Sequence, residues 1–155
     1  MSKLKDEVDL LRSIPMFAEL QPAKLKLLAF ASDRISYSVG DVLCRQGDMA
    51  DAAYVVISGD ADVLVTSGEK ESKVASLGPN SFLGDMAILC DIPRTATVRA
   101  NTPMEALRIR KEHMMELIND TPALAVSVLK EVVQRLAKTT KDLSEAKEEL
   151  AKARA

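Results

Sequence analysis

The stretch from residue 84 to residue 97 reads Gly-Asp-Met-Ala-Ile-Leu-Cys-Asp-Ile-Pro-Arg-Thr-Ala-Thr. A short helix that begins near Gly84 would leave backbone N–H groups without partners in its first turn, and its dipole would favour a negative charge there. Arg94 adds a planar, permanently charged fork that matches paired phosphate oxygens, and Asp85 adds an acceptor for sugar hydroxyls. An acid for a sugar and an arginine for a phosphate together predict a nucleotide site.

The same residues resemble the phosphate-binding cassette of cyclic nucleotide-binding domains. In that family a Gly-Glu-x-Ala-Leu-Leu run is followed by Pro-Arg-x-Ala-Thr, and this chain has Gly-Asp-Met-Ala-Ile-Leu at 84–89 and Pro-Arg-Thr-Ala-Thr at 93–97. The resemblance implies that Arg94 binds the cyclic phosphate and that Asp85 binds the ribose. Because Asp85 stands where the family has Glu, its carboxylate is one methylene shorter, and a weaker or water-mediated ribose contact is expected.

Short runs rich in Val, Ile, Leu and Tyr, punctuated by glycines, extend from about Arg34 to Ile109. Many short strands at close spacing predict a mainly β fold, a jelly-roll β-barrel, with a hairpin tip at residues 66–69. Helical patterns flank the barrel: one over residues 9–15, a second opened by Pro22, and a long helix at the C-terminal end. The resemblance to the family extends over nearly the whole chain and implies the same architecture.

Length and composition limit the alternatives. With 155 residues the chain is expected to form one domain, in which residues 1–120 form the N-terminal helices and the barrel, and residues 121–155 form a helix for dimerisation and for covering the ligand. The net charge of −2 gives no basic footprint for nucleic acid. Two cysteines, interpreted as space-filling, and the lack of a long apolar run predict a cytoplasmic protein without membrane contact.

The final helix carries a heptad pattern. Leucine recurs every seven residues at the d positions, Leu129, Leu136, Leu143 and Leu150. The a positions, three residues before each leucine, are Val126, Val133, Thr140 and Lys147. β-branched residues at a with leucine at d favour a parallel two-stranded coiled coil, so we expect a homodimer. The alternative is that this helix packs on its own barrel.

Further ligand contacts follow from the family resemblance. Thr139 and Thr140 follow an Arg-Leu-x-x run, like a base-contacting Thr-Ser pair in the bacterial catabolite activators of the family; alternatively, they only adjust the register of the helix pair. Val63 and Val74 fall where relatives line the base. The predicted set of ligand-binding residues is Gly84, Asp85, Met86, Ala87, Arg94, Thr95, Val63, Val74, Thr139 and Thr140.

The expected function is that of a cyclic nucleotide sensor whose conformation shifts on binding. Thr95 favours cGMP, because a Thr after the Arg can touch the guanine amino group in relatives, whereas the Thr139–Thr140 pair favours cAMP, which we prefer. Two alternatives remain: a dimeric interaction module that binds another small ligand or none, and the sensor part of a longer transcription regulator. One histidine outside the barrel and no nucleophile or phosphate-loop motif argue against a metal site and against an enzyme. The sequence names no downstream effector.

Overall fold

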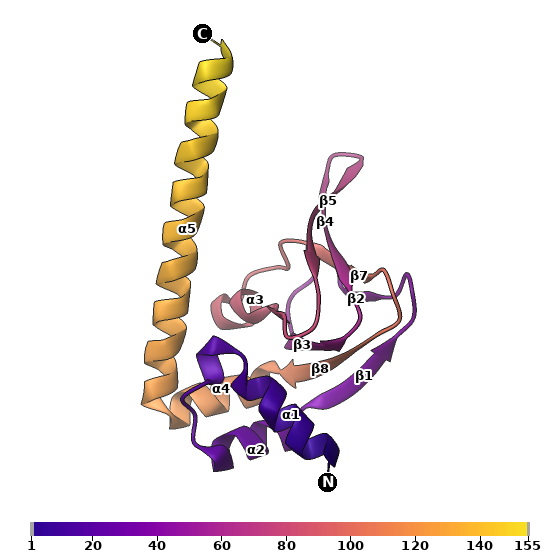
Figure 1. Cartoon of the computed structure of the whole chain (residues 1–155), viewed down its shortest axis with the longest axis vertical. Coiled ribbons are helices and arrows are strands. Elements are labelled where there is room, and N and C mark those ends of the chain that lie inside the picture. The colour runs from indigo at the N-terminus through magenta and orange to yellow at the C-terminus, as the bar shows by residue number, and fades with distance from the viewer. Residues whose placement is uncertain (1, 155) are drawn as a thin grey trace.

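The computed structural model describes residues 2–154, and the side chains of Ser2, Lys3 and Met86 lie outside its description. Helices lie at both ends of the described chain, and the strands lie between them (Figure 1). The helical elements are α1 (Ser2–Arg12), the 3-10 helix η1 (Pro15–Phe17), α2 (Pro22–Ala31), α3 (Asp85–Cys90), α4 (Lys111–Asp120) and α5 (Pro122–Arg154). The strands are β1 (Asp33–Tyr37), β2 (Val42–Cys44), β3 (Ala52–Ser58), β4 (Ala61–Ser67), β5 (Lys70–Leu77), β6 (Phe82–Leu83), β7 (Thr97–Ala100) and β8 (Met104–Arg110).

The strands form two antiparallel sheets of four strands each. One sheet has the order β1-β8-β3-β6 and the other has the order β2-β7-β4-β5. Strands distant in sequence pair side by side; in the first sheet, Asp33 of β1 lies opposite Arg108 of β8. Such pairing wraps the two sheets around a shared interior. The predicted jelly-roll barrel with flanking helices is confirmed.

Strand β3 is buried on both of its faces. Side chains alternate along a strand, so Val55 packs with the helices that cover the first sheet, and Val56 packs in the interior between the sheets. The core beneath the helices includes Leu11, Phe17, Leu25, Leu107, Met114 and Leu124. The core between the sheets includes Leu43, Leu83, Val98, Ala100 and Ala106. The strand therefore forms a wall common to two apolar cores.

Helix α5 extends well past the barrel. At 1.5 Å per residue, its 33 residues cover roughly 50 Å. Near its start Leu124 is buried against the helical core, whereas every residue from 136 to 154 is exposed. Figure 1 shows this second half, in yellow, as a single helix that stands clear of the rest of the chain. In proteins most of a helix's stability comes from packing of an amphipathic face, and the exposed second half of α5 has no such packing against residues 2–135.

The first helix differs in its bounds from the prediction. We expected a helix over residues 9–15 that proline closes, whereas α1 ends at Arg12 and Pro15 opens η1. Proline lacks a backbone N–H and fits the first turn of a helix, so Pro15 starts a new turn. Pro22 opens α2 as predicted.

The tight turn between β3 and β4 requires glycine at position 59. Gly59 has a φ of 85°, and a Cβ atom there would collide with the Pro103 carbonyl oxygen and the Met104 side chain. Gly68, at the tip of the β4–β5 hairpin, also has a positive φ of 65°, but a Cβ there would meet open space. Both glycines therefore adopt a left-handed backbone conformation, but a side chain would collide with neighbouring atoms only at position 59.

We expect Gly59→Ala to lower the free energy of unfolding by roughly 2–5 kcal/mol, the sum of the left-handed backbone cost and an overpacking cost. Gly68→Ala is the matched control, and its expected cost is about 1–2 kcal/mol because the backbone term alone applies. Urea unfolding followed by circular dichroism measures both. Equal losses in the two variants would contradict the steric explanation.

Candidate functional site

The site is built around the start of α3. Gly84 precedes this helix with a φ of 83°, in the left-handed region, and Asp85 is its first residue. A Cβ at position 84 would collide with Nη1 of Arg94, so the arginine side chain lies directly against the glycine backbone. The predicted helix start at Gly84 is confirmed, and glycine is needed there for both its φ and the close approach of Arg94.

Arg94 is buried, and no acidic side chain within residues 2–154 pairs with it. It is 6% exposed, its Nη2 donates a hydrogen bond of 2.6 Å to the Ala52 carbonyl oxygen, and its guanidinium lies 5.8 Å from the centre of the Tyr54 ring. Its backbone N–H donates to the Asp48 carbonyl oxygen at 2.8 Å, which holds the segment in place. Among the described residues Nη1 has no hydrogen-bond partner, and no carboxylate lies within ion-pair distance of the guanidinium. A buried, uncompensated cation of this kind is suited to bind an anion.

Asp85 is buried as well, but its carboxylate is paired. Arg135 of α5 donates from Nη1 to Oδ1 at 3.1 Å, and its Nη2 lies 2.9 Å from Oδ2. The hydrogen bond to Asp85 raises the pKa of the Arg135 guanidinium. The sequence did not predict this contact, because 50 residues separate Asp85 from Arg135. The only sequence feature that pointed to Arg135 was the Arg-Leu run that precedes Thr139.

A hollow of about 270 Å³ opens beside these residues. Apolar side chains from β4, β5, β6, β7, α3 and the loop between α3 and β7 form most of its wall, and the polar groups of the cassette form its rim. The lining residues are Cys44, Val63, Leu77, Leu83, Gly84, Asp85, Ala87, Ile92, Arg94, Thr95, Ala96 and Val98. Six of the predicted ligand-binding residues are thereby brought together, namely Gly84, Asp85, Ala87, Arg94, Thr95 and Val63.

The other predicted residues lie elsewhere. Val74 is the extra residue of a β-bulge, because Ala75 pairs with Val63 and Lys73 pairs with Leu64, and its side chain is 59% exposed. Thr139 and Thr140 are exposed on α5 outside the wall of the hollow. Met86 lies in α3, but its side chain lies outside the described part. For these four residues the ligand contact stays a prediction.

The two cysteines differ in their surroundings. Cys44 is half-buried in the wall of the hollow, and burial raises the pKa of its thiol. Cys90 ends α3 and is exposed, so the interpretation of Cys90 as a space-filling residue is wrong. The short helix turns its last residue toward solvent because α3 buries Ala87 and Ile88 instead.

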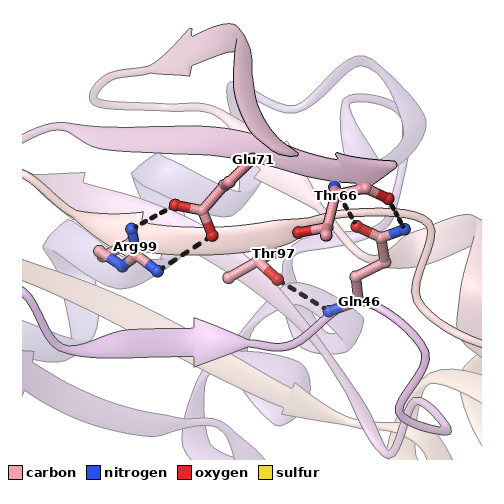
Figure 2. Close-up of polar contacts among 5 residues, drawn as sticks. All are labelled: Gln46, Thr66, Glu71, Thr97 and Arg99. Carbon is pink, nitrogen blue, oxygen red and sulfur yellow. Dashed lines mark hydrogen bonds and ion pairs between the residues drawn. The ribbon is translucent and has the colours of Figure 1, made fainter. Parts of the chain in front are cut away.

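Polar contacts hold together the sheet that forms one wall of the hollow (Figure 2). The Gln46 side-chain amide donates to the Thr66 carbonyl oxygen at 3.2 Å and accepts from the Thr66 N–H at 2.7 Å, while the Gln46 N–H donates to Thr97 Oγ1 at 3.0 Å. Arg99 of β7 donates to both carboxylate oxygens of Glu71 on β5, at 3.0 and 3.4 Å. These contacts tie β4, β5 and β7 to the segment after β2, and Gln46, Glu71 and Arg99 themselves lie outside the lining of the hollow.

Within residues 2–154, no cluster of three or more His, Cys, Asp or Glu side chains is placed to hold a metal ion. In the same part of the chain, no helix combines the length and apolar character needed to cross a membrane.

A family model described as the cyclic nucleotide-binding domain matches residues 34–121. This chain belongs to the cyclic nucleotide-binding domain family. The family's fold is that of regulatory and sensor proteins rather than of catalytic ones. The matched range contains both sheets of the barrel, α3 and α4.

Two curated proteins and one solved structure illustrate what this chain is similar to. The cAMP-dependent protein kinase regulatory subunit of Blastocladiella emersonii is 30% identical over 109 residues, which cover 70% of this chain and 27% of that protein. The cGMP-dependent protein kinase egl-4 of Caenorhabditis briggsae is 32% identical over 127 residues, 80% of this chain and 17% of that protein. The crystal structure of the sensor domain of the transcriptional regulator DNR from Pseudomonas aeruginosa superimposes with a TM-score of 0.82 at 25% identity, covering 91% of this chain and 95% of that one. This cyclic nucleotide-binding domain therefore spans only a minor part of the curated relatives it matches.

The placement of the two cysteines predicts a difference in labelling by iodoacetamide. We expect Cys90 to react faster than Cys44, because only the thiolate reacts and burial keeps the Cys44 thiol protonated to higher pH. Saturating cAMP should slow labelling of Cys44 and leave Cys90 unchanged, since Cys44 alone of the two lines the hollow. Mass spectrometry of tryptic peptides gives both rates. Equal protection of the two cysteines would show that the ligand does not occupy this hollow.

Proposed function

We propose that this domain binds a cyclic nucleotide in the hollow beside α3, prefers cAMP to cGMP, and changes conformation on binding. The observation that carries the proposal is Arg94, a buried guanidinium whose Nη1 has no partner among the described residues. A cyclic phosphate would supply both the missing negative charge and the missing acceptor. The role is that of a cytoplasmic sensor without catalytic activity.

The walls of the hollow suit the rest of a nucleotide. Val63, Val98 and Leu83 offer an apolar surface for the flat faces of a base and for the sugar ring. Asp85 lies on the same rim and can accept hydrogen bonds from ribose hydroxyls. Thus phosphate, sugar and base each have a matching group within one hollow.

The preference for cAMP depends on α5. Thr139 lies one helical turn beyond Arg135, so it shares the face of α5 that approaches the hollow at Asp85. A threonine hydroxyl there can contact the base edge. Thr95, at the rim of the hollow, is the competing feature, because it favours guanine. Of the two relatives described above, one is named for cAMP and one for cGMP.

We further propose that two copies of the chain pair through α5. The d-position leucines and the a-position valines between Val126 and Leu150 form an apolar stripe, which Thr140 and Lys147 interrupt at the other two a positions, and the leucines of this stripe are 53–65% exposed. A long helix with an uncovered leucine stripe at heptad spacing matches the seam of a two-stranded coiled coil. In a dimer each α5 would be stabilised by its partner and held over the ligand site by its own first turns.

Calorimetric titration of cAMP and cGMP tests the ligand, the base preference and the site together. We expect tighter binding of cAMP than of cGMP, and Arg94→Ala to weaken cAMP binding about 10- to 100-fold, as loss of a charged hydrogen bond predicts. Arg99→Ala, which removes an exposed arginine from the outer contacts of the sheet, is the control and should bind like wild type.

Thermal melting of each variant establishes that it is folded. Failure of wild type to bind either nucleotide at micromolar concentration would leave the domain as an interaction module without a nucleotide. An unchanged affinity in folded Arg94→Ala would show that the nucleotide binds elsewhere.

Dimerisation is tested by a pair of double variants matched in composition. We expect Leu136→Gln with Leu143→Gln to convert the dimer to a monomer, because it removes two buried d-position leucines from the seam. The control, Lys138→Gln with Glu145→Gln, also introduces two glutamines and keeps the net charge, but both positions lie opposite the seam. Sedimentation equilibrium measures the mass of each protein. A wild-type monomer, or a control that dissociates equally, would contradict this interface.

A further inference from the structure

The ring of Tyr54 lies next to the Arg94 guanidinium in the barrel interior. Tyr54 is 6% exposed and packs in the core between the two sheets. The guanidinium carbon of Arg94 lies over the Tyr54 ring, 5.8 Å from its centre, which is within the range of a cation–π contact. The Ala52 carbonyl oxygen, which accepts the 2.6 Å hydrogen bond from Nη2 of Arg94, belongs to the same strand. Strand β3 therefore holds the guanidinium at two points.

These two contacts determine which way the guanidinium points. Ala52 and Tyr54 are two residues apart on a strand, so both side chains face the barrel interior. Tyr54 also pairs with Leu83 of β6, the residue before Gly84, so the ring and the start of the cassette are neighbours. While Nη2 is bound to the carbonyl oxygen, Nη1 lies against Gly84 and has no hydrogen-bond partner among the described residues. The unpartnered nitrogen is thus the one next to the start of α3.

A second arginine beside Tyr54 shows how Arg94 differs from an ordinary buried arginine. Arg108 of β8 lies directly opposite Tyr54 in the sheet, and its Nη2 donates a hydrogen bond of 3.1 Å to the Asp33 carboxylate. Arg108 is thus neutralised by its own ion pair, whereas no acidic side chain within residues 2–154 pairs with Arg94. Burial raises the pKa of the Tyr54 phenol, so the ring carries no charge near neutral pH. Arg94 therefore faces an uncharged aromatic ring where Arg108 has a carboxylate.

An aromatic ring and a carboxylate have opposite effects on anion binding by a neighbouring arginine. A carboxylate beside Arg94 would neutralise the guanidinium and compete with a phosphate for the same nitrogens. The face of an aromatic ring attracts a cation through its quadrupole but adds no net charge. A ring can therefore hold a buried guanidinium in place and leave its charge for a ligand.

We propose that Tyr54 is a positioning residue for Arg94: its ring keeps the guanidinium in the hollow, with Nη1 directed to the place of the cyclic phosphate. This inference rests on the proposed function. It adds that the affinity for the nucleotide depends on a side chain that does not line the hollow. Tyr54 acts through Arg94 alone, which distinguishes it from a residue that touches the ligand.

Pre-organisation of the guanidinium sets the sign of the expected effect. Without the ring, the guanidinium of the empty protein has more orientations open to it, and the ligand binds only the fraction that points correctly. Tyr54→Leu keeps an apolar side chain on β3 and removes the ring, so we expect cAMP to bind about 10-fold more weakly. Tyr54→Phe keeps the face of the ring, so its affinity should equal that of wild type.

The test is a double-variant cycle with Arg94→Ala, read by calorimetry with cAMP. If Tyr54 acts through the guanidinium, Tyr54→Leu weakens binding in the wild-type background and leaves the affinity of Arg94→Ala unchanged. Tyr37→Leu is the matched control, because Tyr37 packs on the same core and, among the described residues, the cation–π contact of Arg94 is with Tyr54. Its affinity should equal that of wild type. Thermal melting shows whether each variant is folded, and Tyr54→Met, with a more adaptable side chain, replaces Tyr54→Leu in the cycle if the latter does not fold.

The outcomes separate the two proposals. Equal affinities of wild type and folded Tyr54→Leu overturn the positioning role alone, and tighter binding by Tyr54→Leu overturns it in favour of a ring that merely shields the charge. A loss that persists in the Arg94→Ala background, or that Tyr37→Leu shares, makes Tyr54 a packing residue of the barrel. A loss in Tyr54→Phe assigns the effect to the hydroxyl and overturns the role of the ring. Binding of neither cAMP nor cGMP by wild type overturns the proposed function and the positioning role with it.

Discussion

The burial of one guanidinium without an acidic partner is the constraint that organises the ligand site. The Arg94 guanidinium is removed from water and contacts a carbonyl oxygen of β3 and the ring of Tyr54. These groups orient the guanidinium but carry no negative charge that would neutralise it. Gly84 must then lack a side chain, and α3 must start where it does, because the arginine lies against the glycine backbone. The fold keeps this charge in place, and in the proposed function a ligand phosphate neutralises it.

The hydrogen bond from Arg94 to the Ala52 carbonyl oxygen joins the site to the core. Ala52 belongs to β3, whose alternate side chains pack on the helical core and in the barrel interior. The position of Arg94 therefore depends on packing on both faces of one strand. The proposed anion site is thereby anchored to β3, although two of its other elements, the segment around Asp48 and α3, are irregular or short.

Features that depend on local chemistry could be predicted from the sequence, and features that depend on distant packing could not. The helix start at Gly84, the helix opened by Pro22 and the hairpin tip at Gly68 follow from the conformational range of glycine and proline. The contact of Val74 with the base stays a prediction from the family resemblance, and the sequence did not indicate the bulge that leaves its side chain exposed in β5. Arg135 was missed because nothing local to either residue indicates that its guanidinium meets Asp85.

The burial of β3 on both faces limits which substitutions this strand tolerates. Five consecutive residues of β3, from Ala52 to Val56, are buried, so none of these five positions would let a substituted side chain meet only solvent. Strand β5, by contrast, is exposed over most of its length. Substitutions on the outer hairpin therefore disturb less packing than substitutions in β3, whose Ala52 carbonyl oxygen holds Arg94.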